Sequence, residues 1–213
     1  AFLSDNVFKI ANTSPQTGEF FIYRFFEFLE NVRKFLGSND IRWVVEELSV
    51  KYGFDIVKIP PQSVLEKIDA ILKGSYRREN GEDRIYLPGS ETNYVPLRNA
   101  SSGQQESLWI LMSLYYGISE LLVHNFILEE PEAHLFPDAQ KELVELMAMF
   151  ANATTFNRLL ITTHSPYILT SLNNLLYAYQ VGQNDEKGVS EIVERESWLD
   201  PKRVAAYFVD NGT

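Results

Sequence analysis

Over residues 1–97, apolar positions mostly recur three or four residues apart, which is the spacing of one face of a helix. Three segments with this spacing, each followed by a glycine that can end a helix, cover residues 19–36, 41–52 and 64–73. Ser63 and Glu66 have capping-box spacing at the start of the third. Residues 54–60 are strand-like, and turn residues around RIYLP predict a β-hairpin within 77–97.

From residue 98 onward, helical segments alternate with short apolar runs. Helices are expected over 103–122 and 138–152, and another begins at Ser165, a capping residue followed by proline. The runs 125–130 and 158–164 are typical of buried strands, and two further strands are expected at 175–181 and 189–195. This order predicts a parallel α/β sheet. We therefore expect a mainly helical insert over 1–97 and an α/β lobe over 98–213, whose last residues begin a further helix.

Composition narrows the range of functions. Of 213 residues, 45% are hydrophobic and 23% charged, as in an ordinary globular protein. The chain has no cysteine, which excludes disulfides and thiolate sites and is compatible with a cytoplasmic protein. No apolar stretch is long enough for a membrane span, and the first residues do not resemble a secretory signal. The net charge of -10 disfavours direct binding to nucleic acid.

Acidic and histidine side chains end two predicted strands of the lobe. Glu129 and Glu130 close the run NFILEE, and His164 closes RLLITTH. Ligands of parallel sheets gather at the carboxyl ends of strands, so these three side chains are expected at one sheet edge. Alternation along a strand would send the two carboxylates to opposite faces, one for a hydrated Mg²⁺ and one for a water. The alternative is a pair of solvated acids and a structural histidine.

The start of the long helix at 103–122 carries an unusual group of small and polar residues. Ser101, Ser102 and Gly103 combine hydroxyls, helix-start N–H groups and a glycine, a combination that favours an anion site. Ordinary N-capping by Ser102 is the structural alternative. Capping, however, requires neither Gly103 nor Gln104.

Together, SSGQQ (101–105), NFILEEPEAHLFP (125–137) and ITTHSP (161–166) resemble three motifs of the ATP-binding-cassette class of ATPases. They are similar to the signature, the Walker B segment with its D-loop, and the switch-histidine motif. The closer resemblance is to the AAA-like branch that includes the overcoming-lysogenization-defect family, and it covers about residues 72–210. It implies the C-terminal half of a P-loop-type, ABC ATPase-like fold, with ATP and Mg²⁺ as cofactors.

The resemblance also implies roles for the matched residues. Glu129 would hold Mg²⁺ through water, Glu130 would orient the attacking water, and His164 would contact the γ-phosphate. The signature residues would close over ATP bound to the opposite subunit: Ser101, Ser102, Gly103 and Gln104. The loop joining the two sites would include Glu132, Ala133 and His134. Two positions depart from the common pattern, because aspartate is commoner than Glu129 and transporters have glycine in place of Ser102.

A phosphate-binding P-loop is missing from the sequence. Its motif, G-x-x-x-x-G-K-[ST], needs two glycines five positions apart, and no two of the 11 glycines have that spacing. In the family this loop lies upstream of the helical insert. We therefore expect a portion of a larger ATPase that is inactive alone, with sites formed between the two subunits of a homodimer and with an effector protein or fused domain as a further partner.

Two other functions fit parts of the same pattern. A dimerisation or partner-binding module without catalysis would use the aromatic face of 19–36 as a contact surface. A metal hydrolase would draw nitrogen and oxygen ligands from a group of five residues: Glu129, Glu130, Glu132, His134 and His164. The helical zinc motif, however, requires two histidines on one helix face, and Pro131 interrupts this segment.

Overall fold

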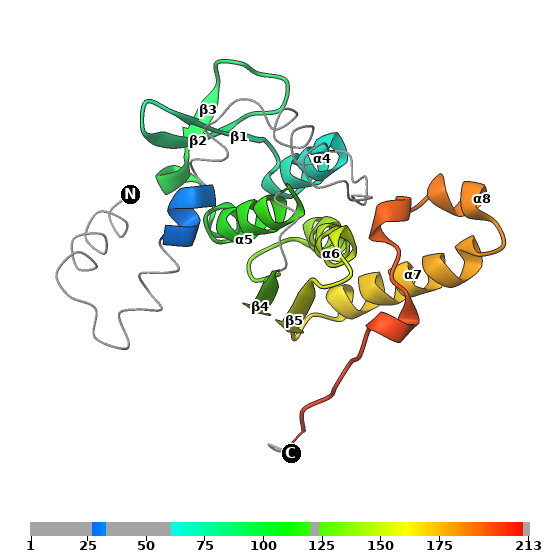
Figure 1. Ribbon diagram of the computed structural model, residues 1–213. Coiled ribbons are helices and arrows are strands. Elements are labelled where there is room, and N and C mark those ends of the chain that lie inside the picture. Colours follow the sequence, from blue (N-terminus) through cyan, green and yellow to red (C-terminus); the bar gives the residue numbers. More distant parts are fainter. Residues whose placement is uncertain (1–26, 33–60, 120–123, 211–213) are drawn as a thin grey trace, which may run out of the picture.

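The computed structural model describes residues 27–32, 61–119 and 124–210 (Figure 1). Residues 27–32 are helical, within the first predicted helix, whereas the helix predicted over 41–52 and the strand over 54–60 lie outside the described residues. The helices are α4 (Pro61–Leu72), α5 (Ser102–Ser119), α6 (Pro137–Ala153), α7 (Pro166–Gly182) and α8 (Glu186–Ser190). The strands are β1 (Ser75–Glu79), β2 (Glu82–Tyr86), β3 (Tyr94–Pro96), β4 (Asn125–Glu129) and β5 (Arg158–Thr162).

The helix α6 forms the centre of the molecule. Figure 1 shows α4, α5 and α7 arranged around it, and α6 makes contacts with all three. Its fully buried apolar side chains form a broad face of the helix: Leu143, Val144, Leu146, Met147, Met149 and Phe150. The remaining side carries Lys141, Glu142 and Glu145. A helix with so broad an apolar face belongs in a core, so α6 is the element around which the described helices pack.

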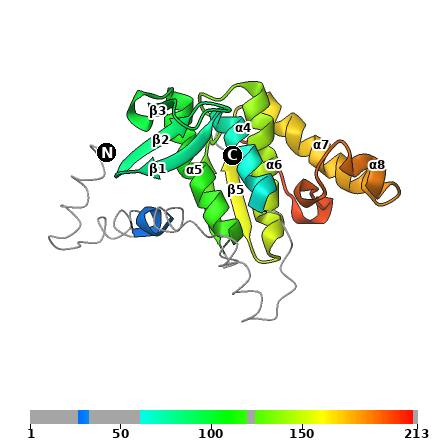
Figure 2. The ribbon, with the colours of Figure 1, turned by 90° about the horizontal axis from the view of Figure 1, so that it is seen from above.

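An antiparallel sheet follows α4 and confirms the predicted hairpin. The strands run in the order β1-β2-β3, and β2 contains most of the RIYLP run. Asn80 and Gly81 join β1 to β2 with φ angles of 52° and 79°, the left-handed pair that a two-residue hairpin turn requires. Figure 2 shows this sheet and α8 on opposite sides of the molecule.

The strands β4 and β5 form a parallel pair, joined by the crossover helix α6, as the sequence predicts. One face of this pair packs on the core through four partly buried residues: Phe126, Leu128, Leu159 and Ile161. The other face is open. Ile127 and Leu160 are register partners on it, with 76% and 58% of their surface exposed. The prediction that both strands are buried is therefore wrong for one face.

Two of the four predicted strands do not form: 175–181 are helical, whereas 189–195 contain the end of α8, a turn and the first residue of the 3-10 helix Arg195–Ser197. Residues 175–181 continue α7, because Ile168, Leu175 and Ala178 are buried at helical spacing and no proline or glycine interrupts the run. Residues 189–195 follow the start of α8, where the Asp185 carboxylate accepts a hydrogen bond from the N–H of Gly188 and caps the helix. Residues 183–188, between the two predicted strands, thus contain a helix start.

The C-terminal segment also differs from its prediction. After Asp200, residues Pro201–Arg203 form a single 3-10 turn, and 204–210 contain neither helix nor strand. This segment leaves the rest of the molecule as the red trace in Figure 1. No helix among the described residues combines the length and apolar character that crossing a bilayer requires.

Candidate functional site

The loop between β4 and α6 has a strained backbone at two positions. Glu130 has a φ of 44° and His134 a φ of 60°, both in the left-handed region that non-glycine residues rarely adopt. Between them, the N–H of Ala133 donates to the carbonyl of Glu130 at 2.9 Å, and the N–H of Leu135 donates to that of Glu132 at 3.0 Å. Strain of this kind concentrates at functional sites, so residues 130–134 are a candidate functional segment.

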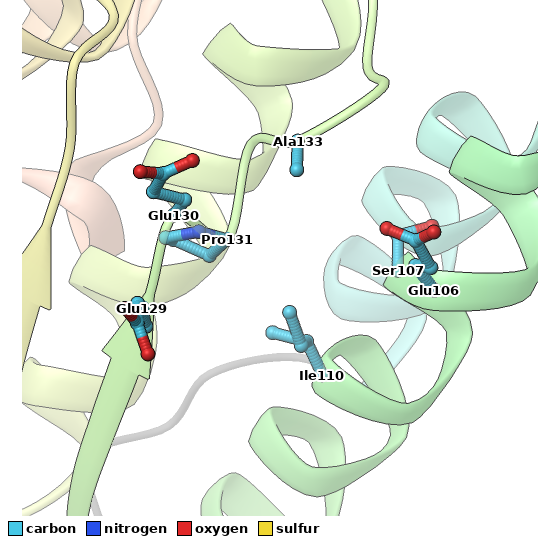
Figure 3. A pocket seen from close by; sticks show the side chains of 7 residues that line it. All are labelled: Glu106, Ser107, Ile110, Glu129, Glu130, Pro131 and Ala133. Carbon is cyan, nitrogen blue, oxygen red and sulfur yellow. The ribbon is translucent and has the colours of Figure 1, made fainter.

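The left-handed conformation of Glu130 changes the expected placement of the two acids. Glu129 ends β4 on the open face with Ile127, but Glu130 has already left the strand. Strand alternation therefore does not apply to this pair, and both residues line one cavity. Figure 3 shows the carboxylate of Glu130 pointing away from α5. The prediction of opposite faces assumed that the strand continues through Glu130, and this assumption is wrong.

Glu130 and His164 lie side by side, as their predicted positions at adjacent strand ends require. The N–H of Glu130 donates to the carbonyl of Thr162 at 3.0 Å, which extends the β4–β5 pairing by one step. Nε2 of His164 is 3.4 Å from Oε1 of Glu130. The histidine side chain is 91% exposed and the glutamate 50%, so the pair is accessible to a ligand.

The start of α5 is a capping box built by Ser101 and Gln104. The Ser101 hydroxyl accepts from the N–H of Gln104 at 3.3 Å, and Oε1 of Gln104 accepts from the N–H of Ser101 at 3.0 Å. Nε2 of Gln104 also donates to the carbonyl of Leu72 at 2.6 Å, which joins α5 to the end of α4. The capping residue is therefore Ser101 and not Ser102, and Gln104 has a structural role. The predicted box at Ser63 is wrong because α4 already begins at Pro61.

The glycine at position 103 also has a structural explanation. A Cβ built on Gly103 would stand 2.5 Å from the carbonyl oxygen of His134 and 3.5 Å from a methyl carbon of Leu135. The first turn of α5 therefore packs directly on the loop that follows β4. The anion-site hypothesis assigned this glycine to the approach of a ligand, whereas the structure fills the space with the protein's own backbone. The structure thus brings the segments 101–104 and 130–135 together.

A cavity of about 370 Å³ separates α5 from the loop after β4 (Figure 3). Its lining residues are Glu106, Ser107, Ile110, Glu129, Glu130, Pro131 and Ala133. The three from α5 are not in the sequence-based set of candidates. Helical periodicity could have found them, because positions 106, 107 and 110 lie three, four and seven residues after Gly103. Ser107 is 2% exposed, and its hydroxyl has no hydrogen-bond partner within the described residues.

The two loop histidines pair with different acids. Nε2 of His134 lies 3.8 Å from Oε2 of Glu106, while His164 faces Glu130. Within the described part of the chain, no three His, Cys, Asp or Glu side chains are grouped closely enough to hold a metal ion by themselves. The ligand set that a metal hydrolase would need is therefore not assembled among these residues. Exposed carboxylates such as Glu129 still fit a hydrated Mg²⁺, whose other ligands are commonly water and phosphate oxygens.

The parallel strands, their crossover helix and the acids at the strand ends define a P-loop-type α/β protein. The sequence model of one family, described as the AAA ATPase domain, matches residues 20–169. This match covers more than half of the chain, and the chain therefore belongs to the AAA ATPase domain family, a family of ATP-binding ATPases. The matched range contains the start of α5, the loop after β4 and His164. A search of curated proteins finds no match to the chain.

Proposed function

We propose that the chain contributes the hydrolytic half of an ATPase site, in which Glu130 orients the attacking water and His164 contacts the γ-phosphate. The observation that carries the proposal is the 3.4 Å approach of these two side chains from the ends of two parallel strands. Their exposure leaves room for a ligand between them and solvent. Membership of an ATPase family supports the same chemistry.

Glu129 is proposed to hold Mg²⁺ through water. It stands at the end of the open face of the β4–β5 pair, next to Glu130 along the chain. Bound Mg²⁺ would supply charge neutralisation for the phosphate oxygens. The carboxylate of Glu129 would fix the place of the hydrated ion, and that of Glu130 would accept a hydrogen bond from the water it orients.

The cavity beside these residues does not fit a triphosphate on its own. Its charged lining residues are Glu106, Glu129 and Glu130, and carboxylates repel phosphate oxygens. Phosphate binding needs cationic side chains or N–H groups, which the missing P-loop motif would provide. We therefore propose that the P-loop comes from another segment of polypeptide, and that the chain alone does not hydrolyse ATP.

The open face of the parallel pair is the proposed position of that segment. Parallel sheets are normally covered on both faces, yet Ile127 and Leu160 face solvent here. A lobe packed on this face would bury the apolar pair and reach Glu129 at the same time. In this arrangement the P-loop of the packed lobe would lie next to Glu129 at the end of β4.

The signature residues are proposed to act on ATP held by a second subunit of a homodimer. The capping box engages Ser101 and Gln104, which leaves the hydroxyl of exposed Ser102 and the first N–H groups of α5 for a phosphate. Because Gly103 packs on the His134 backbone, any movement of this turn would also move the loop that carries Glu132, Ala133 and His134. These loop residues would thereby link one site to the other.

Calorimetric titration with Mg-ATP tests the proposal. The 213-residue chain is titrated alone, and again in a longer polypeptide that includes a P-loop. We expect no binding heat from the chain alone, and binding with hydrolysis from the longer protein. Micromolar binding by the chain alone would contradict the proposed half-site, because it would require a phosphate cradle within this sequence.

A partner-binding module without catalysis is the second candidate, and the exposed pair Ile127 and Leu160 favours it. Paired apolar residues on an open strand face are a common contact surface. This candidate predicts that the longer protein assembles but does not hydrolyse ATP. The same titration, followed by a phosphate-release assay, separates the two functions.

A further inference from the structure

Glu132 has an environment that its place in a surface loop does not explain. The residue is 7% exposed, and its Oε1 accepts a hydrogen bond from the hydroxyl of Thr163. Oε2 is also buried and has no hydrogen-bond partner within the described residues. A buried carboxylate oxygen without a partner costs stability, so the burial of Glu132 calls for a reason.

Thr163 and Ser165 hold the backbone on both sides of His164. The Thr163 hydroxyl accepts from the N–H of Ser165 at 3.0 Å, which closes a tight turn over the histidine. The Ser165 hydroxyl donates to Oε1 of Gln140 at 2.6 Å. Nε2 of Gln140 donates to the carbonyl of Leu135 at 2.9 Å, so the chain of hydrogen bonds returns to the loop that contains Glu132.

The position of the His164 side chain depends on this turn. The side chain is 91% exposed and faces Glu130 at 3.4 Å, so packing does little to orient it. Its direction follows from the backbone conformation at residues 163–165. On the loop side, the bond from Thr163 to Glu132 is a direct side-chain link to that conformation, and Gln140 adds an indirect link between Ser165 and Leu135.

We infer that Glu132 is a positioning residue that holds the turn 163–165 so that His164 faces Glu130. A carboxylate accepts hydrogen bonds and donates none, so the Thr163 hydroxyl must give its proton to Glu132 and keep its lone pairs for the N–H of Ser165. A glutamine could present its NH₂ group to Thr163 instead and compete with Ser165 for the same lone pairs. The negative charge therefore fixes the direction of the hydrogen-bond chain, a role that an amide of the same shape does not fill. The consequence for catalysis rests on the proposed function, whereas the positioning itself does not.

Three substitutions test the inference. Glu132→Gln keeps the shape and removes the charge, Thr163→Val removes the hydroxyl, and Thr163→Ser keeps it. Glu191→Gln removes a charge from an exposed position and serves as the matched control. Thermal unfolding of each variant shows whether it is folded at the temperature of the other measurements.

The first readout is nuclear magnetic resonance of the chain itself, uniformly labelled with nitrogen-15, so that the Ser165 amide and the rings of its 3 histidines are both observed. For Glu132→Gln and Thr163→Val we expect amide exchange at Ser165 to rise about fivefold to tenfold, the factor for losing one hydrogen bond. The His164 ring signals should shift, while those of His124, whose ring packs beside Phe126 at a centroid distance of 5.7 Å, should not. Thr163→Ser and Glu191→Gln should match the unmodified chain.

The second readout is ATP hydrolysis in a longer protein that includes a P-loop. Glu132→Gln should lower kcat by about tenfold to a hundredfold with little change in KM, because a misplaced group affects the reaction more than binding. If Glu132→Gln leaves Ser165 exchange and the His164 signals unchanged, the inference is overturned. If the unmodified longer protein does not hydrolyse ATP, the proposed function fails, and the resonance measurements still decide whether Glu132 positions His164.

Discussion

Gly103 and His134 are in direct backbone contact, and a Cβ on Gly103 would lie 2.5 Å from the His134 carbonyl oxygen. This contact joins the first turn of α5 to the loop after β4, although the two residues are far apart in the sequence. The same loop carries Glu130 at one end and His134 at the other, both with left-handed backbones. The signature-like turn and the acidic loop are thus one packed unit.

Gly103→Ala tests this contact. The added methyl group meets backbone and not a flexible side chain, so the segments must move apart, at a cost of about 1–3 kcal/mol. In a protein of this size, each kcal/mol lowers Tm by roughly 2–4 °C. Thermal unfolding followed by circular dichroism measures the change. Ser102→Ala, at the exposed neighbouring position, should stay within about 0.5 kcal/mol of the unmodified chain. Equal stability of the two variants would show that the close approach is absent.

The capping box predicts coupling between Ser101 and Gln104. Ser101→Ala should cost about 1 kcal/mol, and Gln104→Ala somewhat more because it also loses the bond to the Leu72 carbonyl. Since the two side chains bond to each other's N–H groups, the double variant should be more stable than the sum of the single losses, by about 0.5 kcal/mol or more. Urea unfolding of the four proteins gives the coupling energy. Strict additivity would mean that the box does not form in solution.

The sequence predicted those elements whose pattern runs through their whole length. The helices α5 and α6 and the parallel strands β4 and β5 lie close to their expected positions, and Glu130 meets His164 as strand-end geometry requires. The boundary placed between residues 97 and 98 stays a prediction. Residue type and spacing were sufficient here because each element meets its neighbours through the face that its own pattern marks.

The wrong predictions came from packing that single segments do not encode. The run LLYAYQV is rich in residues that favour strands, but burial of Leu175 and Ala178 continues α7 through it. Nothing in a pair of glutamates signals the left-handed φ of Glu130. Apolar residues in a strand indicate burial, yet they do not identify the element that packs on them. Ile127 is an example, because its side chain is exposed among the described residues.

The free energy of unfolding should depend strongly on the buried charge of Lys67. Its Nζ bonds to Glu145 and lies 3.3 Å from carboxylate oxygens of Glu142 and Glu194. Burial lowers the pKa of Lys67, but the hydrogen bond and the glutamate charges outweigh it and raise this pKa above 10.5. Lys67→Met should cost about 3 kcal/mol at pH 7, because it takes the buried cation from Glu145, which then keeps only Lys141, a more exposed lysine at 3.0 Å. Urea unfolding measures the loss.

The direction of the Lys67 shift also sets a pH dependence. A raised folded-state pKa gives stability that is fully present below pH 10.5 and is lost as pH rises through the folded-state value. The unmodified chain should therefore lose stability more steeply than Lys67→Met above pH 10.5. Lys187→Met, at an exposed site, should follow the unmodified chain at every pH. Parallel curves for all three proteins would contradict the assignment.

Substitutions on the open face of the β4–β5 pair should weaken assembly without changing the stability of the chain. Ile127→Thr and Leu160→Thr alter exposed side chains and should change the free energy of unfolding by less than about 0.5 kcal/mol. In the proposed assembly the same changes remove apolar area from an interface and should weaken binding of a P-loop lobe by about tenfold or more. Leu128→Thr, on the core face of the same strand, should instead destabilise the chain. Calorimetric binding and urea unfolding distinguish the two patterns, and unchanged affinity for both exposed variants would remove this face from the assembly.

Glu130→Gln separates the two candidate functions. Oε1 of Glu130 is within 3.4 Å of His164, and the amide keeps the shape of the carboxylate while losing its ability to accept a proton. In a longer protein with a P-loop, hydrolysis should fall by about 10²–10⁴-fold, with ATP still bound. The bound nucleotide should then hold the proposed dimer together, and light scattering with Mg-ATP measures the mass of that dimer.

Glu191→Gln should retain full activity and dissociate after hydrolysis. If Glu130→Gln hydrolyses ATP at the unmodified rate, another group orients the water; if neither protein hydrolyses ATP but both assemble, the chain is a binding module.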